Sequence, residues 1–121
     1  MATINITEEN FNDTISNNDM VFIDFWASWC GPCLSFAPIF EKASNKHTDI
    51  VFGKVNTEEQ QALAGSFGVR SIPTVSIFKE KVLVFSQPGA LQPPALDSLA
   101  EQVRALDMDK VRKQMAEQEK K

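Results

Sequence analysis

The chain has 121 residues, of which 43% are hydrophobic and 23% charged, as in one globular domain and unlike a disordered or fibrous chain. Its formal net charge of -4 offers no basic surface, so neither nucleic acid nor a membrane is expected as a partner. The N-terminal sequence lacks a basic segment followed by an apolar run, so no secretory leader is expected. No apolar run approaches the roughly 18 residues of a membrane span. We therefore expect a cytoplasmic protein, in which a lasting structural disulfide would be unusual.

The first part of the chain is predicted to alternate strands and helices. A short strand at residues 3–6 precedes a helix at residues 8–16, with an N-cap threonine just before it. The nearly continuous apolar run at residues 21–26 is typical of a central strand covered on both faces. One carboxylate, Asp24, interrupts this run at a position where a buried side chain is expected. The spacing of apolar residues then predicts a helix over residues 33–45.

The middle of the chain continues the same alternation. Residues 50–55 are largely apolar and are predicted to form a third strand. Thr57 and Gln60 have the spacing of a capping box, which would open a short helix. Either Gly65 or Gly68 is expected to end that helix, because glycine readily adopts the left-handed conformation of a C-cap.

The C-terminal part changes the pattern to two strands and a helix. Strands at residues 74–78 and 82–85 are too close for a parallel crossover and are expected to be antiparallel. A helix with one apolar face follows at residues 93–106. The order βαβαβ and then ββα predicts an α/β fold. Its single mixed central sheet would have a parallel core, an antiparallel edge strand and helices on both faces.

The predicted domain covers residues 1–106, and residues 107–121 form a charged C-terminal extension. The simpler interpretation of this extension is an exposed, partly frayed continuation of the last helix. Its three apolar residues, at loose helical spacing, would alternatively contact a partner or a second copy of the chain; they are Met108, Val111 and Met115.

The two cysteines of the chain, Cys30 and Cys33, allow three interpretations. A structural zinc site needs four ligands, and the chain adds only one histidine, His47, which is expected in a solvated surface loop. A structural bridge across so small a loop would stabilise the fold only weakly. The third interpretation is redox chemistry, because free N–H groups and the helix dipole favour a thiolate where a helix begins. A cysteine pair at a strand-to-helix junction favours this third interpretation.

Four stretches of the sequence resemble the thioredoxin family. The main one is WASWCGPC at residues 26–33, and the others are VFIDF at 21–25, FGVRSIPT at 67–74 and PGAL at 88–91. The resemblance spans roughly residues 3–106 and implies the thioredoxin fold. It also implies an enzyme, a thiol–disulfide oxidoreductase that donates electrons to target protein disulfides through Cys30 and Cys33.

The resemblance implies a role for each reacting group. Cys30 corresponds to the nucleophile and Cys33 to the cysteine that resolves the mixed disulfide. Asp24 corresponds to a buried aspartate that takes the proton of the second cysteine, and burial should raise its pKa. The alternative for Asp24 is a structural acid paired with a cation such as Lys54. The family also holds the proline at position 73 in the cis conformation beside the sulfurs.

The resemblance further implies an apolar target-binding surface around Cys30. The residues at the matching positions are Trp29, Gly31, Pro32, Ile72, Pro73, Gly89 and Ala90. Each of them could instead serve ordinary packing or a turn. Leu34 departs from the family, which often has lysine after the second cysteine, so target preference is expected to be more apolar. A second departure is Glu80-Lys81, where relatives usually have a turn that contains glycine.

Partners and cofactors follow from the same resemblance. The chain would bind no cofactor and no metal of its own, and its redox group would be the Cys30–Cys33 disulfide. A thioredoxin reductase carrying FAD and using NADPH would regenerate it, and disulfide-containing proteins would be its targets. The chain is expected to act as a monomer. Two alternatives remain, a disulfide isomerase or oxidase of the same superfamily and a non-enzymatic binding subunit that uses the same apolar surface.

Overall fold

The computed structural model describes residues 2–119, and five strands in that part of the chain form one sheet. They are β1 (Thr3–Asn5), β2 (Met20–Trp26), β3 (Val51–Asn56), β4 (Thr74–Lys79) and β5 (Val82–Pro88). The order across the sheet is β1-β3-β2-β4-β5. β1 and β2 both pair in parallel with β3, whereas β4 pairs antiparallel with both β2 and β5. The predicted α/β fold with a parallel core and an antiparallel edge is confirmed.

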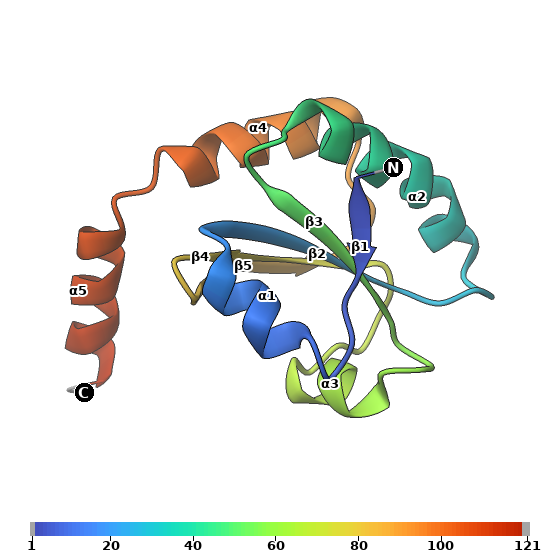
Figure 1. Cartoon of the computed structure of the whole chain (residues 1–121), viewed down its shortest axis with the longest axis horizontal. Coiled ribbons are helices and arrows are strands. Elements are labelled where there is room, and N and C mark those ends of the chain that lie inside the picture. Colours follow the sequence, from blue (N-terminus) through green and yellow to red (C-terminus); the bar gives the residue numbers. More distant parts are fainter. Residues whose placement is uncertain (1, 120–121) are drawn as a thin grey trace.

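Five helices within residues 2–119 surround the sheet (Figure 1). They are α1 (Phe11–Asn17), α2 (Gly31–Lys46), α3 (Gln61–Ser66), α4 (Pro93–Arg104) and α5 (Met108–Glu119). α2 and α4 cover one face of the sheet, and α1 and α3 lie on the other. α5 follows α4 and lies apart from these layers.

The central strand β2 sends its side chains alternately to the two faces. Met20 and Phe22 pack in the core beneath α2 and α4, whereas Ile23 and Phe25 pack beneath α1 and α3. Because successive side chains of a strand point to opposite faces, Asp24 lies on the α2 side, in line with Phe22. The sheet therefore places this carboxylate under the helix that begins with the cysteine pair.

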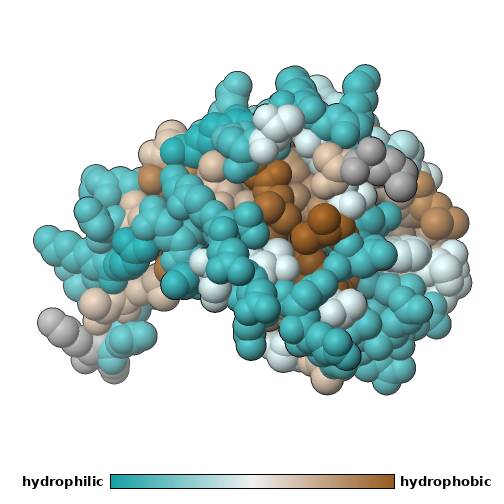
Figure 2. All heavy atoms as spheres, in the orientation of Figure 1, coloured by the Kyte–Doolittle hydropathy of each residue, from teal (hydrophilic) through white to brown (hydrophobic). Residues whose placement is uncertain are grey.

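The face of the molecule shown in Figure 2 is mostly hydrophilic, with hydrophobic residues gathered over β1 and β3. Ile4, on the edge strand β1, is one of the exposed large hydrophobic residues. Among residues 2–119, no helix is both long enough and apolar enough to cross a membrane.

The first helix starts later than the sequence predicts. Residues 8–10 form a turn, and α1 begins only at Phe11. Thr7 and Asn10 stabilise this turn reciprocally, because the Thr7 hydroxyl accepts the Asn10 N–H at 3.2 Å and Asn10 Oδ1 accepts the Thr7 N–H at 2.8 Å. Thr7 therefore caps the turn that leads into α1 instead of the helix itself.

The predicted capping box of the third helix is wrong. The Thr57 hydroxyl donates to the carbonyl of Trp26 at 3.1 Å, and the side chain of Gln60 accepts the backbone N–H of Glu8 at 2.9 Å. Both side chains thus bond to distant segments instead of to each other's backbone. Gly68 supplies the predicted stop, because its φ of 65° is left-handed and the next N–H, of Val69, reaches back to a carbonyl of α3.

The β4–β5 hairpin turns through two residues that are not glycine. Glu80 and Lys81 have φ values of 50° and 71°, so both adopt the left-handed conformation that a tight two-residue hairpin requires. The N–H of Glu80 also donates to the carbonyl of Asp19 at 2.8 Å, which ties the turn to the segment before β2. The departure noted in the sequence therefore leaves the hairpin tight but places side chains in a costly conformation.

The buried ammonium of Lys79 binds the C-terminal end of α4. Its Nζ donates to the carbonyls of Val103 at 2.7 Å and of Arg104 and Leu106 at 3.1 Å each. A cation at this position satisfies carbonyls that have no partner within the helix and complements the negative end of the helix dipole.

The C-terminal segment forms a helix of its own instead of continuing α4. Asp107 Oδ1 accepts the backbone N–H groups of Asp109 and Lys110, which is the geometry of a new N-cap. Met108 is buried, and Arg112 pairs with Glu80 of the hairpin turn. Residues 120–121 of the predicted extension lie outside the described residues.

Candidate active site

The two cysteines form a disulfide at the point where α2 begins. Cys30 is the N-cap residue of α2, with extended backbone angles, and its Sγ accepts the N–H of Cys33 at 3.2 Å. Pro32 occupies the first turn, where a missing N–H costs no helical hydrogen bond. The sulfur of Cys30 therefore takes the place of a capping oxygen, at the positive end of a 16-residue helix.

An apolar cluster surrounds the sulfurs. Both cysteines are buried together with Ala27, and Trp26 and Ile72 pack against them. The carbonyl oxygen of Ile72 lies 3.7 Å from the Sγ of Cys30. By contrast, Trp29, which immediately precedes Cys30, is 70% exposed. The disulfide is thus nearly covered but sits beside a large accessible aromatic surface.

Two loops from the antiparallel part of the sheet meet beside this cluster. The Ile72–Pro73 peptide bond is cis, and Pro73 is buried. Its carbonyl accepts the N–H of Gly89 at 2.8 Å, which holds the loop after β5 against the loop before β4. Gly89 has a φ of 108°, a conformation that side-chain-bearing residues rarely adopt.

The remaining residues of the expected target-binding surface are solvent-exposed. Gly31 and Pro32 lie in the exposed first turn of α2, and Ala90 follows Gly89 on an exposed loop. Trp29 and Ile72 also line one side of a shallow groove that α3 and the following loop complete. The structure thus brings Ile72, Pro73 and Gly89 together by direct contacts.

The carboxyl group of Asp24 is fully enclosed, with 0% of the residue exposed. Neither of its oxygens has a hydrogen-bond partner among the residues that the structure describes. Burial raises the pKa of Asp24 from 3.8 to about 7, and the positive charge of Lys54 opposes this effect in part. A carboxyl with this pKa can accept or release a proton near neutral pH.

Lys54 faces Asp24 across the β2–β3 pair, but it does not form an ion pair with it. The two residues are register partners, yet within residues 2–119 no contact of 4 Å or less joins their charged groups. The ammonium of Lys54 instead lies 4.7 Å from the centre of the Trp26 ring, in a cation–π arrangement. Trp26 was not predicted as a site residue, although its position between the central strand and the cysteine loop could have indicated it.

Comparison with known proteins identifies the family. The family model described as Thioredoxin matches residues 2–105, most of the chain. The chain belongs to the thioredoxin family. A family relative from Streptomyces coelicolor is 54% identical over 118 residues, which cover 98% of this chain and 88% of that protein.

Solved thioredoxin structures agree with this assignment. A mutant thioredoxin from Halobacterium salinarum has a TM-score of 0.80 and 34% identity, covering 87% of this chain and 93% of that one. Plasmodium falciparum thioredoxin has a TM-score of 0.76 and 35% identity, covering 83% and 97%. With its Cys30–Cys33 pair in place, this thioredoxin-family member is a thiol–disulfide oxidoreductase that reduces protein disulfides.

The redox group of the protein is the disulfide itself. In the part of the chain that the structure describes, no three histidine, cysteine or acidic side chains gather as metal ligands do. As for the family in general, the partners are a thioredoxin reductase and proteins that carry disulfides.

The prediction for His47 is wrong, because this histidine is only 6% exposed and fully partnered. Its Nδ1 lies 2.8 Å from the guanidinium of Arg104, and its Nε2 lies 2.7 Å from Asp97. Since a guanidinium can only donate, Nδ1 accepts and Nε2 donates its hydrogen to the carboxylate. Arg104 also binds Asp49, which lowers the pKa of Asp49 to about 2. His47 therefore joins the end of α2 to α4 and has no part in the redox site.

Proposed function

We propose that Cys30 is the nucleophile of this disulfide reductase and Cys33 the resolving cysteine. The Cys30 thiolate attacks one sulfur of a target disulfide, forms a mixed disulfide and releases the other target sulfur as a thiolate. Cys33 then attacks Cys30 Sγ, which re-forms the Cys30–Cys33 disulfide and releases the second target thiol. Two electrons pass to the target. The observation that carries this assignment is that Cys30 Sγ caps α2 and accepts the Cys33 N–H.

Asp24 acts in the second step of this proposal. Cys33 must lose its proton before it attacks, and it is buried among apolar residues, where a thiolate forms reluctantly. Asp24 lies under α2 with a pKa of about 7, and its oxygens have no hydrogen-bond partner within residues 2–119, which supports a role as the acceptor of that proton. The proton would then pass from the carboxyl to solvent once the disulfide has formed.

Targets dock on the surface around Cys30 in this proposal. The residues assigned to it are Trp29, Gly31, Pro32, Ile72, Pro73, Gly89 and Ala90. The exposed ring of Trp29 and the contacts among Ile72, Pro73 and Gly89 support one continuous apolar surface. Such a surface suits an extended target segment that carries its disulfide toward the sulfurs.

The partner assignment completes the proposal. A thioredoxin reductase with FAD and NADPH returns electrons to the Cys30–Cys33 disulfide, so both cofactors belong to that enzyme. The chain acts as a monomer in the cytoplasm, in line with a target surface formed by one chain alone.

Trapping of targets tests the roles of the two cysteines. Cys33→Ser should accumulate mixed disulfides on Cys30 when it is incubated with native, disulfide-bonded insulin, whereas Cys30→Ser should not. The wild-type chain should reduce insulin with NADPH and a thioredoxin reductase. Mixed disulfides on residue 33 in the Cys30→Ser variant, at the yield of the Cys33→Ser variant, would reverse the assignment.

A further inference from the structure

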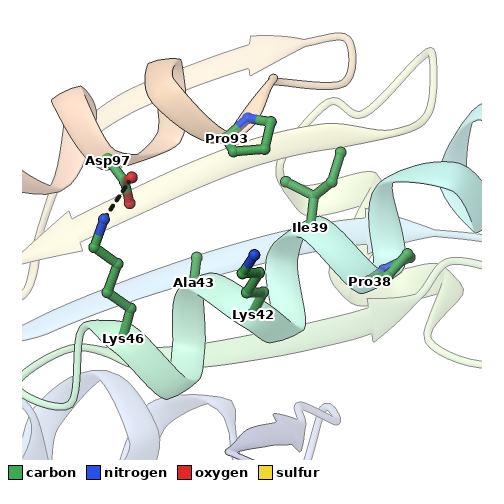
Figure 3. Close-up of a pocket in the computed structure, with 7 residues that line it drawn as sticks. All are labelled: Pro38, Ile39, Lys42, Ala43, Lys46, Pro93 and Asp97. Carbon is green, nitrogen blue, oxygen red and sulfur yellow. Dashed lines mark hydrogen bonds and ion pairs between the residues drawn. The ribbon is translucent and has the colours of Figure 1, made fainter.

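A groove of about 410 Å³ runs between α2 and α4, outside the proposed target surface (Figure 3). α2 supplies most of its lining, and α4 closes the opposite side. The residues that line it are Pro38, Ile39, Lys42, Ala43, Lys46, Pro93 and Asp97. Ile39 and Ala43 point toward α4, and Pro93 lies across from them, so the floor of the groove is apolar.

One ridge of α2 leads from the disulfide to this groove. Leu34, Pro38, Lys42 and Lys46 are spaced four residues apart, and such residues lie on one row along a helix. Leu34 is 53% exposed and directly follows Cys33. The row therefore begins with Leu34 next to the cysteine pair and continues through Pro38, Lys42 and Lys46, which all line the groove.

The two lysines of the groove differ in whether they form an ion pair. Lys46 pairs with Asp97 at 2.8 Å, and this pair bridges α2 and α4 at one end of the groove (Figure 3). Lys42 has no carboxylate within 4 Å among residues 2–119. Pro93 opens α4 and lines the groove, so the positive end of that helix dipole also borders it. The first turn of α4 carries no acidic residue that would offset this positive end. Because Lys46 is paired with Asp97, the groove keeps the single positive charge of Lys42 above its apolar floor, in a chain with a net charge of -4.

We propose that this groove binds an acidic segment of the target protein while the disulfide of that target reacts at Cys30. The apolar floor would accept an apolar side chain of the segment, and Lys42 would pair with its carboxylate. This inference rests on the proposed function of Cys30, and it adds a second contact region to the surface around the disulfide.

Helix geometry sets where the acidic residue must lie. Lys42 is nine residues beyond Cys33, whose backbone nitrogen lies 3.2 Å from the reacting sulfur of Cys30. Nine residues correspond to about 14 Å along the helix axis, at 1.5 Å per residue. An extended chain covers that distance in about four residues. A favoured target would therefore carry an acidic residue about four positions from its reacting cysteine.

Synthetic peptides test this selectivity. Each peptide has one intramolecular disulfide and carries either Glu or Gln four residues before, or four residues after, its first cysteine. The second-order rate constant for reduction by the dithiol form of the protein is measured at low salt. For one of the two placements, the wild-type chain should reduce the Glu peptide about two- to five-fold faster than the Gln peptide, the effect expected of an exposed ion pair.

Two charge reversals separate the groove from the overall charge. Lys42→Glu should abolish or invert the preference for Glu, whereas Lys113→Glu, an equal charge change on an exposed position of α5, should preserve it. Thermal unfolding checks that both variants are folded. An equal Glu-to-Gln ratio in the wild type and in Lys42→Glu, at both placements, would overturn the inference while leaving the reductase intact. If the wild-type chain reduced none of the peptides and no insulin, the proposed function itself would fail.

Discussion

Replacing the buried carboxyl of Asp24 by an amide is expected to stabilise the protein at neutral pH. The carboxyl is fully enclosed and has no hydrogen-bond partner within residues 2–119. In the folded state, only the positive charge of Lys54 offsets part of the desolvation cost of ionising it. Asp24→Asn keeps the shape of the side chain and removes the charge. The variant should therefore gain stability wherever the unfolded wild-type chain is ionised.

The size of the effect follows from the two pKa values of Asp24. Below pH 3.8 the carboxyl is protonated in both the folded and the unfolded state, so it adds no pH dependence to the unfolding free energy. As the pH rises, the unfolded chain ionises first while the folded chain stays protonated up to about pH 7, so the unfolding free energy falls across this window. A raised pKa of about 7 against 3.8 corresponds to a loss of about 4 kcal/mol at neutral pH. Above pH 7 both states are ionised and the loss is constant.

Urea unfolding of the oxidised protein measures this effect without interference from thiols. The difference in unfolding free energy between Asp24→Asn and the wild type should grow by about 3.5 kcal/mol between pH 4 and pH 7.5. Asp13→Asn, which removes an exposed charge on α1, is the matched control for the loss of one negative charge. If the Asp24→Asn difference were flat with pH, the carboxyl would not be held protonated by burial, and its role as a proton acceptor near neutrality would lose its basis.

Three further predictions concern the C-terminal half of the fold, and urea unfolding measures each. Lys79→Met removes the ammonium that donates to three carbonyls at the end of α4 and should lower the unfolding free energy by about 1–3 kcal/mol. An unchanged urea midpoint would contradict this. Lys81→Gly should raise it by about 1 kcal/mol, since glycine adopts a φ of 71° without strain, and destabilisation would argue against the tight turn. Met108→Ala should cost about 2–4 kcal/mol, but Arg112→Ala less than about 1 kcal/mol, because the Arg112 pair with Glu80 is half-exposed. Equal losses of unfolding free energy in these last two variants would mean that the ion pair holds α5 as strongly as the packing of Met108 does.

The parts of the fold that were predicted from the sequence depend on local patterns. The run of apolar residues around Asp24 indicated a central, doubly covered strand, and the same run indicated that this carboxyl is buried. The position of the cysteine pair between a strand and a helix was also predictable, because both elements lie next to it in the chain. Gly68 as a helix stop is likewise a property of one residue and its immediate neighbours.

The wrong predictions concern polar side chains whose partners are distant in the sequence. Thr57 has the spacing of a cap but bonds to the carbonyl of Trp26, on the neighbouring strand. His47 looks like a loop residue, but its partners Asp97 and Arg104 lie 50 and 57 residues away. The strand predicted at residues 74–78 stops short of Lys79, which belongs to β4 and lies under the end of α4, 24 residues away. A local pattern records what a side chain can bond to, and only the tertiary structure decides which partner it meets.

The position of Lys79 has a consequence for where a shortened form of this protein could end. The family model stops at residue 105, but one of the three carbonyls that receive the Lys79 ammonium belongs to Leu106, and the buried Met108 follows two residues later. A chain cut at the family boundary would keep a buried cation with an incomplete set of acceptors and would expose the surface that Met108 covers. We therefore expect the smallest cooperative folding unit to extend into α5, so that its C-terminal limit is set by a lysine of the central sheet and not by the catalytic motif.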